Sequence, residues 1–212
     1  LDIPPINLVI PEVVTLNLAT ELKAYVTINT IEEKKIIFNS IDYNLKQSFG
    51  LIDFTPENYQ SDLFGKLNFL ARIVGTFPLT TGMEIELKSD SPTGAGLGGS
   101  SAMGVVLYRA LSKVFNLPIE RMRSIKVVNE IESIILNSGP AGYQDYFPAM
   151  YGGILSLHPT PGEVRVMQHF SPELKQKLET NMSLIYSGET RLSGINNWEV
   201  FKGFFDKNDE II

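Results

Sequence analysis

The sequence contains no cysteine. Its absence excludes a disulfide-stapled scaffold, a thiolate nucleophile and a zinc site built on cysteines. Apolar runs are also short, and none approaches the roughly 20 residues that a helix needs to cross a bilayer. No basic and then apolar signal peptide opens the chain. We therefore expect a compact cytoplasmic protein with no membrane partner.

Positive charge is scarce as well. Eighteen Lys and Arg residues stand against 24 Asp and Glu, which gives a net charge of −6 at pH 7. Proteins that bind duplex nucleic acid carry a clustered basic footprint, and this sequence has none, so we expect no nucleic-acid partner. The 212 residues make one large domain or two small ones, with enough apolar residues for a core that needs no metal.

Hydrophobic periodicity predicts alternating strands and helices. Strands are predicted at Val13–Leu18, Lys23–Asn29, Lys35–Asn39, Met83–Lys88, Ile154–Leu157, Val164–Met167 and Met182–Tyr186. Helices are predicted at Glu57–Phe77, Ser100–Phe115, Ile119–Leu136, Asp145–Tyr151, Ser171–Glu179 and Ser193–Phe205. The turn-rich stretch His158–Gly162 predicts a domain boundary, with domains at residues 1–160 and 161–212.

A glycine-rich loop, Ser91–Gly99, joins a predicted strand to a long apolar helix. Four glycines within six residues lose much conformational entropy on folding. In this setting the backbone N–H groups and the positive end of the helix dipole point at one spot, which suits phosphate. Ser100 and Ser101 follow in the first turn. They are placed to cap the helix or to bind a magnesium ion carried by the phosphates.

Several functions remain open for this loop. Gly94, Gly96 and Gly99 fit the dinucleotide fingerprint, which also requires a further strand ending in an acidic residue. Gly98–Ala102 nearly matches the elbow of serine hydrolases, for which only His158 and His169 are available as a base. A Walker loop is excluded, because no Gly-Lys-Ser/Thr ends the motif. A plain glycine turn with a serine cap is the structural alternative.

The segment Pro92-x-x-x-Gly96-Leu97-Gly98-Gly99-Ser100-Ser101-Ala102 resembles the central motif of the GHMP kinases. In that family the loop wraps the phosphates of ATP and its second serine binds Mg²⁺. The resemblance implies that Ser100 is the magnesium ligand, while Gly99 stands where the family has its first serine. It implies that the phosphates contact Pro92, Gly94, Ala95, Gly96, Leu97, Gly98, Gly99, Ser100 and Ser101.

Other segments extend the resemblance towards the sugar kinases of that family, the fucokinases and heptose 7-phosphate kinases. Glu132, in an Ile-Glu pair, is implied as a second magnesium ligand, with Glu130 as second choice and a solvated helical residue as the alternative. Gly139–Asp145, followed by Gly152-Gly153, resembles the segment whose aspartate faces the substrate hydroxyl. Asp145 is therefore implied as the catalytic residue, or else as a helix N-cap.

Two outer segments carry the rest of the resemblance. Asp2-Ile3-Pro4-Pro5 is similar to a family segment whose aspartate binds the sugar, so Asp2 is implied as a substrate ligand. A mobile end is the alternative. Leu184–Ser193 is similar to a Tyr-Thr-Gly-x-x-Arg-Leu segment of the same subgroup. Tyr143 replaces a lysine common in heptose kinases, which leaves the sugar unspecified.

The resemblance implies an α/β (α+β) fold: a GHMP kinase-like N-terminal domain with a mixed sheet and helices, then the start of a ferredoxin-like second domain. It implies ATP- and Mg²⁺-dependent phosphorylation of a sugar or sugar phosphate. Family members start earlier and extend further, so we expect the chain to lack a first strand and a C-terminal part. Two rivals remain. One is an inactive nucleotide- or sugar-binding homologue that completes itself as a homodimer, and the other is a dinucleotide-dependent oxidoreductase.

Overall fold

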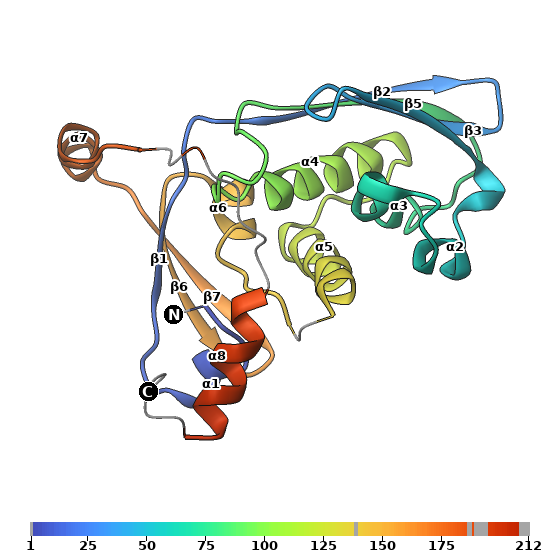
Figure 1. The fold of residues 1–212 in the computed structure, drawn as a ribbon. Helices are drawn as coiled ribbons and strands as arrows, with labels where there is room; N and C mark the ends of the chain where they lie inside the picture. Colours follow the sequence, from blue (N-terminus) through green and yellow to red (C-terminus); the bar gives the residue numbers. More distant parts are fainter. Residues whose placement is uncertain (1, 138–139, 186–187, 189–194, 208–212) are drawn as a thin grey trace.

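The computed structural model describes residues 2–137, 140–185, 188 and 195–207. This part of the chain forms two sheets and a group of helices (Figure 1). The strands are β1 (Thr15–Leu18), β2 (Ala24–Ile31), β3 (Lys35–Ser40), β4 (Leu45–Gly50), β5 (Gly82–Ser89), β6 (Ile154–Thr160) and β7 (Glu163–His169). The helices are α1 (Ile6–Val9), α2 (Pro56–Gln60), α3 (Asn68–Val74), α4 (Gly99–Val114), α5 (Arg121–Leu136), α6 (Tyr146–Tyr151), α7 (Pro172–Asn181) and α8 (Ile195–Phe205), with short 3₁₀ turns η1 (Leu51–Asp53) and η2 (Gly65–Leu67).

The larger sheet is mixed, with the strand order β2-β5-β3-β4. β5 runs antiparallel to β2 and parallel to β3, and β3 runs antiparallel to β4. Burial alternates along β5, where Met83, Ile85 and Leu87 are buried while Glu86 and Lys88 are exposed. This alternation confirms the half-buried strand predicted from the sequence, because successive side chains of a strand point to opposite faces.

The smaller sheet is antiparallel throughout, with the order β1-β6-β7. β6 and β7 form a hairpin paired from Ile154 with His169 to Thr160 with Glu163. The stretch expected to hold a domain boundary contains the turn of this hairpin, so strand pairing joins the chain on its two sides. The division at residue 160 and the ferredoxin-like second domain stay predictions.

Helix α4 lies at the centre of the fold. It packs on β2 and β5 on one side and on α3, α5 and α6 on the others, so the helices cover one face of the larger sheet (Figure 1). A single cluster of buried apolar side chains includes Phe38 from this sheet, Leu107 from α4 and Leu155 from the smaller sheet. One core therefore fixes the two sheets relative to α4. Among the described residues, no helix has the length and apolar character needed to span a membrane.

The single helix predicted at Glu57–Phe77 is wrong, because the chain forms α2, η2 and α3 in that region. Thr55 caps α2 by accepting a hydrogen bond from the Asn58 N–H. The helix then ends at Ser61, whose backbone is extended, and Gly65 has a positive φ of 46°. The side chains of Asn68 and Arg72 both donate to the carbonyl of Tyr59. The buried residues Leu67, Leu70 and Ile73 lie on η2 and α3, after this break.

Two further differences concern strands. Strand β4 was not predicted, although Asn44, with φ 45°, marks the turn that precedes it. The predicted strand at Met182–Tyr186 is wrong for Met182–Ile185, which has no strand structure and whose apolar side chains are exposed. Tyr186 lies outside the described residues. The remaining predicted strands, and the helices that became α4, α5, α6, α7 and α8, are confirmed within a few residues at their ends.

Gly104 marks the closest packing of α4 against its neighbours. A Cβ added there would lie 2.5 Å from Cγ1 of Val128 in α5 and 2.8 Å from Cζ of Phe69 in α3. We expect Gly104→Val to lower the free energy of unfolding by about 1–3 kcal/mol, because overpacking forces side chains from their rotamers. Urea denaturation measures this change. Lys113→Ala, on the exposed side of α4, serves as the control and should change it by less than about 0.5 kcal/mol. An equal effect of both would contradict the packing described here.

Candidate functional site

The glycine loop leaves β5 at Ser89 and enters α4 at Gly99. Gly94, Gly96 and Gly98 all have positive φ values, of 73°, 73° and 68°. L-residues with a side chain rarely adopt this conformation, so the three glycines determine the course of the loop. Gly98 is also the N-cap residue of α4, and no side chain caps the helix. The serine cap considered for Ser100 and Ser101 is therefore absent.

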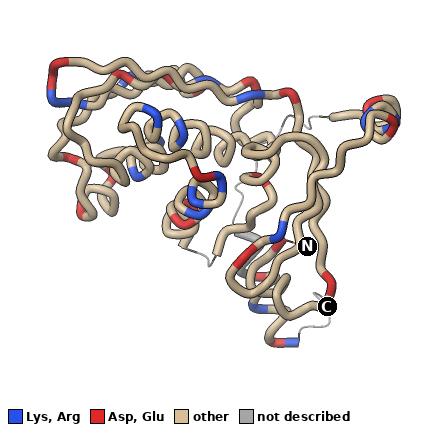
Figure 2. Tube along the Cα trace, turned by 180° about the vertical axis from the view of Figure 1, so that it is seen from behind, with Lys and Arg blue, Asp and Glu red and all other residues tan. Residues whose placement is uncertain are grey.

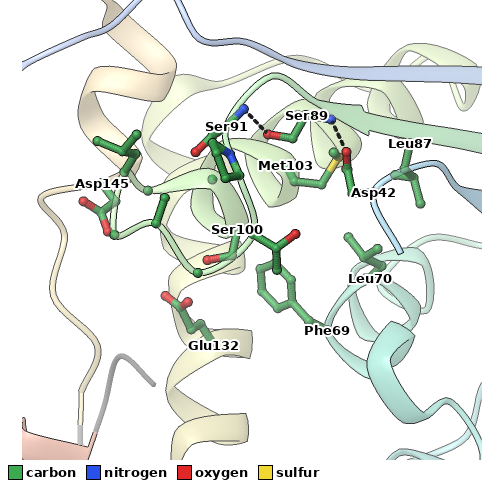
Figure 3. Close-up of a pocket in the computed structure, with 18 of the residues that line it drawn as sticks. Asp42, Phe69, Leu70, Leu87, Ser89, Ser91, Ser100, Met103, Glu132 and Asp145 are labelled. Carbon is green, nitrogen blue, oxygen red and sulfur yellow. Dashed lines mark hydrogen bonds between the residues drawn. The ribbon is translucent and has the colours of Figure 1, made fainter. Parts of the chain in front are cut away.

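Side-chain hydrogen bonds fix the start of the loop. The Ser89 N–H donates to Oδ1 of Asp42 at 3.1 Å, and the Ser91 N–H donates to Oγ of Ser89 at 3.1 Å (Figure 3). Oγ of Ser91 is buried without a hydrogen-bond partner among the described residues. Buried hydroxyls nearly always have a partner. The unsatisfied oxygen therefore fits a polar ligand at this loop.

A cavity of about 430 Å³ opens beneath the loop. All the loop residues predicted to bind phosphate except Ser101 line it, together with Glu132 of α5 and Asp145 before α6. Figure 3 shows the Ser100 hydroxyl and the Glu132 carboxylate facing the same space, with Asp145 beside the loop. The cavity continues past Phe69 and Leu70 of α3 to Asp42. Its size is in the range of small-molecule sites.

Asp145 lies directly against the glycine loop. A Cβ added to Gly98 would be 3.0 Å from Cβ, 3.1 Å from Cγ and 3.3 Å from Oδ1 of Asp145. Only glycine at residue 98 therefore lets the carboxyl group approach so closely. Asp145 stands at the N-cap position of α6 but makes no side-chain capping bond there. The alternative of a purely capping role is not supported.

Glu132 is tied to α6 through Tyr146, which is 1% exposed. The Tyr146 hydroxyl donates to Oε2 of Glu132 and also shares a hydrogen bond with Ser101. The pKa of Glu132 is raised above its ordinary value. Burial is the main cause and the charge of Asp145 adds to it, while the hydrogen bond from Tyr146 acts in the opposite direction. Burial, and then the charge of Glu132, raises the pKa of Tyr146, so its hydroxyl stays a proton donor. Glu130 is exposed and does not line the cavity.

Asp2 lies close to this site without lining the cavity. Its Oδ2 accepts a hydrogen bond from the Gln144 N–H at 2.6 Å. Burial raises the pKa of Asp2, while the backbone N–H groups of Gln144 and Tyr143 lower it. The structure thus brings Asp2 beside the residue that precedes Asp145. Of the similar segment Leu184–Ser193, Tyr186, Ser187 and residues 189–193 lie outside the described residues.

The alternatives for the glycine loop find no matching geometry in the described part of the chain. Helix α4 leads into α5 rather than into a strand beside β5, so the strand–helix–strand unit of a dinucleotide site is not formed. His158 and His169 both hydrogen-bond Ser156, at 3.1 and 2.9 Å. Neither lines the cavity, so neither is placed to serve Ser100 as a base.

The sequence did not reveal several residues that shape the site. Tyr146 follows Asp145 directly, but its contact with Glu132 depends on how α6 packs against α5. Asn17 in β1 donates to the carbonyl of Gln144 at 2.9 Å. Asn129 in α5 donates to the carbonyls of Ala141 and Gly142 at 3.1 and 2.9 Å. Isolated asparagines give no spacing pattern, so only the fold identifies them.

The glycine loop, two carboxylates and a serine hydroxyl thus meet at one cavity of a mixed α/β fold. Comparison with known proteins gives the family. Residues 63–153 match the family described as GHMP kinases N terminal domain. The matched segment contains the glycine loop, Glu132 and Asp145. This part of the chain is therefore similar to a GHMP kinase N-terminal domain.

Among curated proteins, the chain is 33% identical over 141 residues to a D-glycero-alpha-D-manno-heptose 7-phosphate kinase of Campylobacter jejuni, covering 65% of this chain and 40% of that protein. It is 27% identical over 118 residues to a bifunctional fucokinase/GDP-fucose pyrophosphorylase of Arabidopsis thaliana, covering 54% of this chain and 11% of that protein. The chain thus spans well under half the length of these curated relatives.

Solved structures agree with the fold. A D-glycero-D-manno-heptose 1-phosphate kinase of Bacteroides thetaiotaomicron has a TM-score of 0.65 at 25% identity, covering 79% of this chain and 55% of that one. Mevalonate kinase of Methanococcus jannaschii has a TM-score of 0.64 at 21% identity, covering 90% and 63%. The predicted GHMP-type α/β fold is confirmed, and sugar kinases are among the relatives.

The partly buried carboxyl of Glu132 makes folding stability depend on pH. The pKa of Glu132 is higher in the folded than in the unfolded state. The protonated carboxyl therefore contributes its full stabilisation at pH values below the unfolded-state pKa, and this contribution is lost as the pH rises through the folded-state pKa. Glu132→Gln stays neutral and keeps an acceptor for Tyr146. Without added metal, we expect this variant to melt at a higher temperature than the wild type near pH 8 and to lose that advantage near pH 4.

Differential scanning calorimetry at both pH values checks this expectation. Glu130→Gln, an exposed neighbour on the same helix, should leave the melting temperature unchanged at both. A pH-independent difference for Glu132→Gln would show that the burial of its charge does not matter for stability.

Proposed function

We propose that this protein transfers the terminal phosphoryl group of ATP, in the presence of Mg²⁺, to a hydroxyl of a sugar or sugar phosphate. The observation that carries the proposal is the convergence of the glycine loop, Ser100, Glu132 and Asp145 on one cavity. Phosphoryl transfer needs mainly positioning and charge neutralisation. These are the properties that this set of groups supplies.

The glycine loop is assigned to the phosphates. Its positive-φ glycines leave the backbone N–H groups open to close approach, and α4 adds the positive end of its dipole. Lys66 precedes the loop in the sequence but lines the same cavity and adds a positive charge to it. The loop therefore binds the donor through its phosphates rather than through a carbon skeleton.

Ser100 and Glu132 fit the magnesium ion. Among the described residues, no group of three or more His, Cys, Asp or Glu side chains is arranged to hold a metal. Mg²⁺ usually takes one or two protein oxygens together with substrate phosphates, and a hydroxyl facing a carboxylate across the cavity matches that mode (Figure 3). When bound, the ion would neutralise charge on the phosphates. Tyr146 orients the Glu132 carboxylate by donating to Oε2.

Asp145 is assigned to the acceptor hydroxyl. Its carboxylate accepts the hydrogen bond of that hydroxyl, fixes the attacking oxygen near the loop and takes up its proton. The closeness of Asp145 to Gly98 supports this role, because donor phosphate and acceptor then lie on two sides of one backbone segment. Holding reactants in such geometry contributes much of the rate enhancement of enzymes.

The acceptor class follows from the relatives, whose names specify heptose phosphates and fucose. We propose a sugar or sugar phosphate as acceptor and a cytoplasmic setting, with no nucleic-acid or membrane partner. Both charge signs are present on α5 and α7 (Figure 2), and the net charge is −6. The homodimer considered in the sequence analysis stays a prediction.

Asp145→Asn tests the proposal. We expect kcat to fall by about 10²–10⁴-fold, the usual contribution of a general base, while Mg-ATP binding measured by calorimetry stays within about twofold. The assay measures ADP release with fucose, galactose and heptose 7-phosphate as acceptors. Asp62→Asn, an exposed carboxylate outside the cavity, is the matched control.

Equal rates for wild type and Asp145→Asn would remove Asp145 from the reaction. Binding of Mg-ATP by a wild type that shows no turnover would favour an inactive binding protein. No binding at all would count against both functions.

Magnesium dependence tests the other two residues. We expect Ser100→Ala and Glu132→Gln each to raise the Mg²⁺ concentration at half-maximal rate by roughly ten- to a hundredfold, as the loss of groups around a metal commonly does. Titration of Mn²⁺ with ADP, followed by electron paramagnetic resonance, gives the same comparison without turnover. Glu130→Gln should behave as the wild type. Unchanged metal affinity in both variants would place the ion elsewhere.

A further inference from the structure

The backbone of Gln144 is held from two sides by the N-terminal part of the chain. Oδ2 of Asp2 accepts a hydrogen bond from its N–H at 2.6 Å. Nδ2 of Asn17 donates to its carbonyl at 2.9 Å. Asp2 and Asn17 thus satisfy both polar groups of the residue that immediately precedes Asp145.

The carboxylate of Asp2 has partners on both of its oxygens. Asn7, which is 3% exposed, donates from Nδ2 to Oδ1 of Asp2 at 3.4 Å. Gly142 completes this contact, since a Cβ there would lie 2.6 Å from Oδ2 and 2.8 Å from the carbonyl oxygen of Asp2. The backbone near Gln144 is therefore shaped to receive Asp2. The Asp2 carboxylate, which the family resemblance assigns to sugar binding, is therefore already hydrogen-bonded within the protein.

Helix α5 holds the other end of the same segment. Nδ2 of Asn129 donates to the carbonyls of Ala141 and Gly142, and Oγ of Ser133 accepts from the Ala141 N–H at 2.8 Å. The backbone between Ala141 and Gln144 is thus fixed from α5 on one side and from the N-terminal residues on the other. Asp145 follows at the end of this fixed stretch and packs against Gly98.

We propose that Asp2 and Asn17 are positioning residues that clamp the backbone N–H and C=O of Gln144 and thereby hold the Asp145 carboxylate against the glycine loop. This inference rests on the proposed function, in which Asp145 binds the acceptor hydroxyl. A misplacement of about 1 Å can cost about a hundredfold in rate, so the clamp acts on kcat. A residue that only contacted the sugar would act on the KM of the sugar.

The contrast between Asp2→Asn and Asp2→Ala separates the two roles. The amide of Asp2→Asn keeps an oxygen for the Gln144 N–H, and its NH₂ group can donate to Oδ1 of Asn7, which is buried without a partner among the described residues. We therefore expect Asp2→Asn to keep kcat within about twofold of the wild type. We expect Asp2→Ala and Asn17→Ala each to lower kcat by about 10- to 100-fold, with the KM of ATP unchanged. Glu21→Ala, an exposed acid in the segment after β1, is the control.

Amide hydrogen exchange followed by NMR gives a readout that needs no turnover. We expect the Gln144 N–H to exchange at least tenfold faster in Asp2→Ala than in the wild type and in Asp2→Asn. The amides of α4 should stay protected in all variants, which excludes global unfolding as the cause. Local opening of this kind exchanges independently of the core.

The outcomes are distinct. A wild type without turnover for any acceptor contradicts the proposed function, and the exchange of Gln144 still decides whether the clamp exists. Turnover in which Asp2→Asn raises the KM of the sugar tenfold or more at unchanged kcat overturns the clamp in favour of a sugar contact. Unchanged exchange of Gln144 in Asp2→Ala overturns it as well. Slower turnover with faster exchange in Asp2→Ala and Asn17→Ala, rescued in Asp2→Asn, supports it.

Discussion

The approach of Asp145 to the backbone of Gly98 is the contact on which the rest of the site depends. It joins two segments that belong to different helices, the loop before α4 and the start of α6. A side chain at residue 98 would meet the carboxyl group of Asp145 at 3.0–3.3 Å. The positive φ of Gly98 further restricts this position to glycine. The loop and the acidic group therefore share one space only because this residue lacks a Cβ.

The groups around this contact are held by polar bonds as well as by apolar packing. Asn129 and Ser133 bind the loop before Asp145 from α5, and Tyr146 connects α6 to Glu132. Each such bond contributes only about 0.5–1.5 kcal/mol net, but an unpaired buried partner costs more. A network of this type fixes one arrangement of the segment more strongly than it adds to stability.

The sequence was sufficient to predict helices, strands and loops that are specified by residues close together in the chain. The alternation in β5, the glycine loop and the apolar run of α4 were all predicted, and the resemblance led to Glu132 and Asp145. The break at Ser61 was missed because it depends on side-chain contacts: Asn68 and Arg72 donate to the Tyr59 carbonyl in place of a helical N–H. The strand predicted at Met182–Tyr186 relied on residue type alone. Tyr146, Asn17 and the contact of Asp2 with Gln144 depend on tertiary packing, for which spacing gives no signal.

The pairing of the chain's beginning with its later part has a consequence for biosynthesis. The sheet of β2, β5, β3 and β4 can form once residue 89 has been made, whereas β1 must wait for Ile154–Leu157, its partners in β6. Chains emerge from the ribosome N-terminus first, so β1 stays unpaired while most of the described chain is synthesised. The hydrogen bond from Asn17 of β1 to the Gln144 carbonyl, beside Asp145, can therefore form only after the strands of the larger sheet have been made.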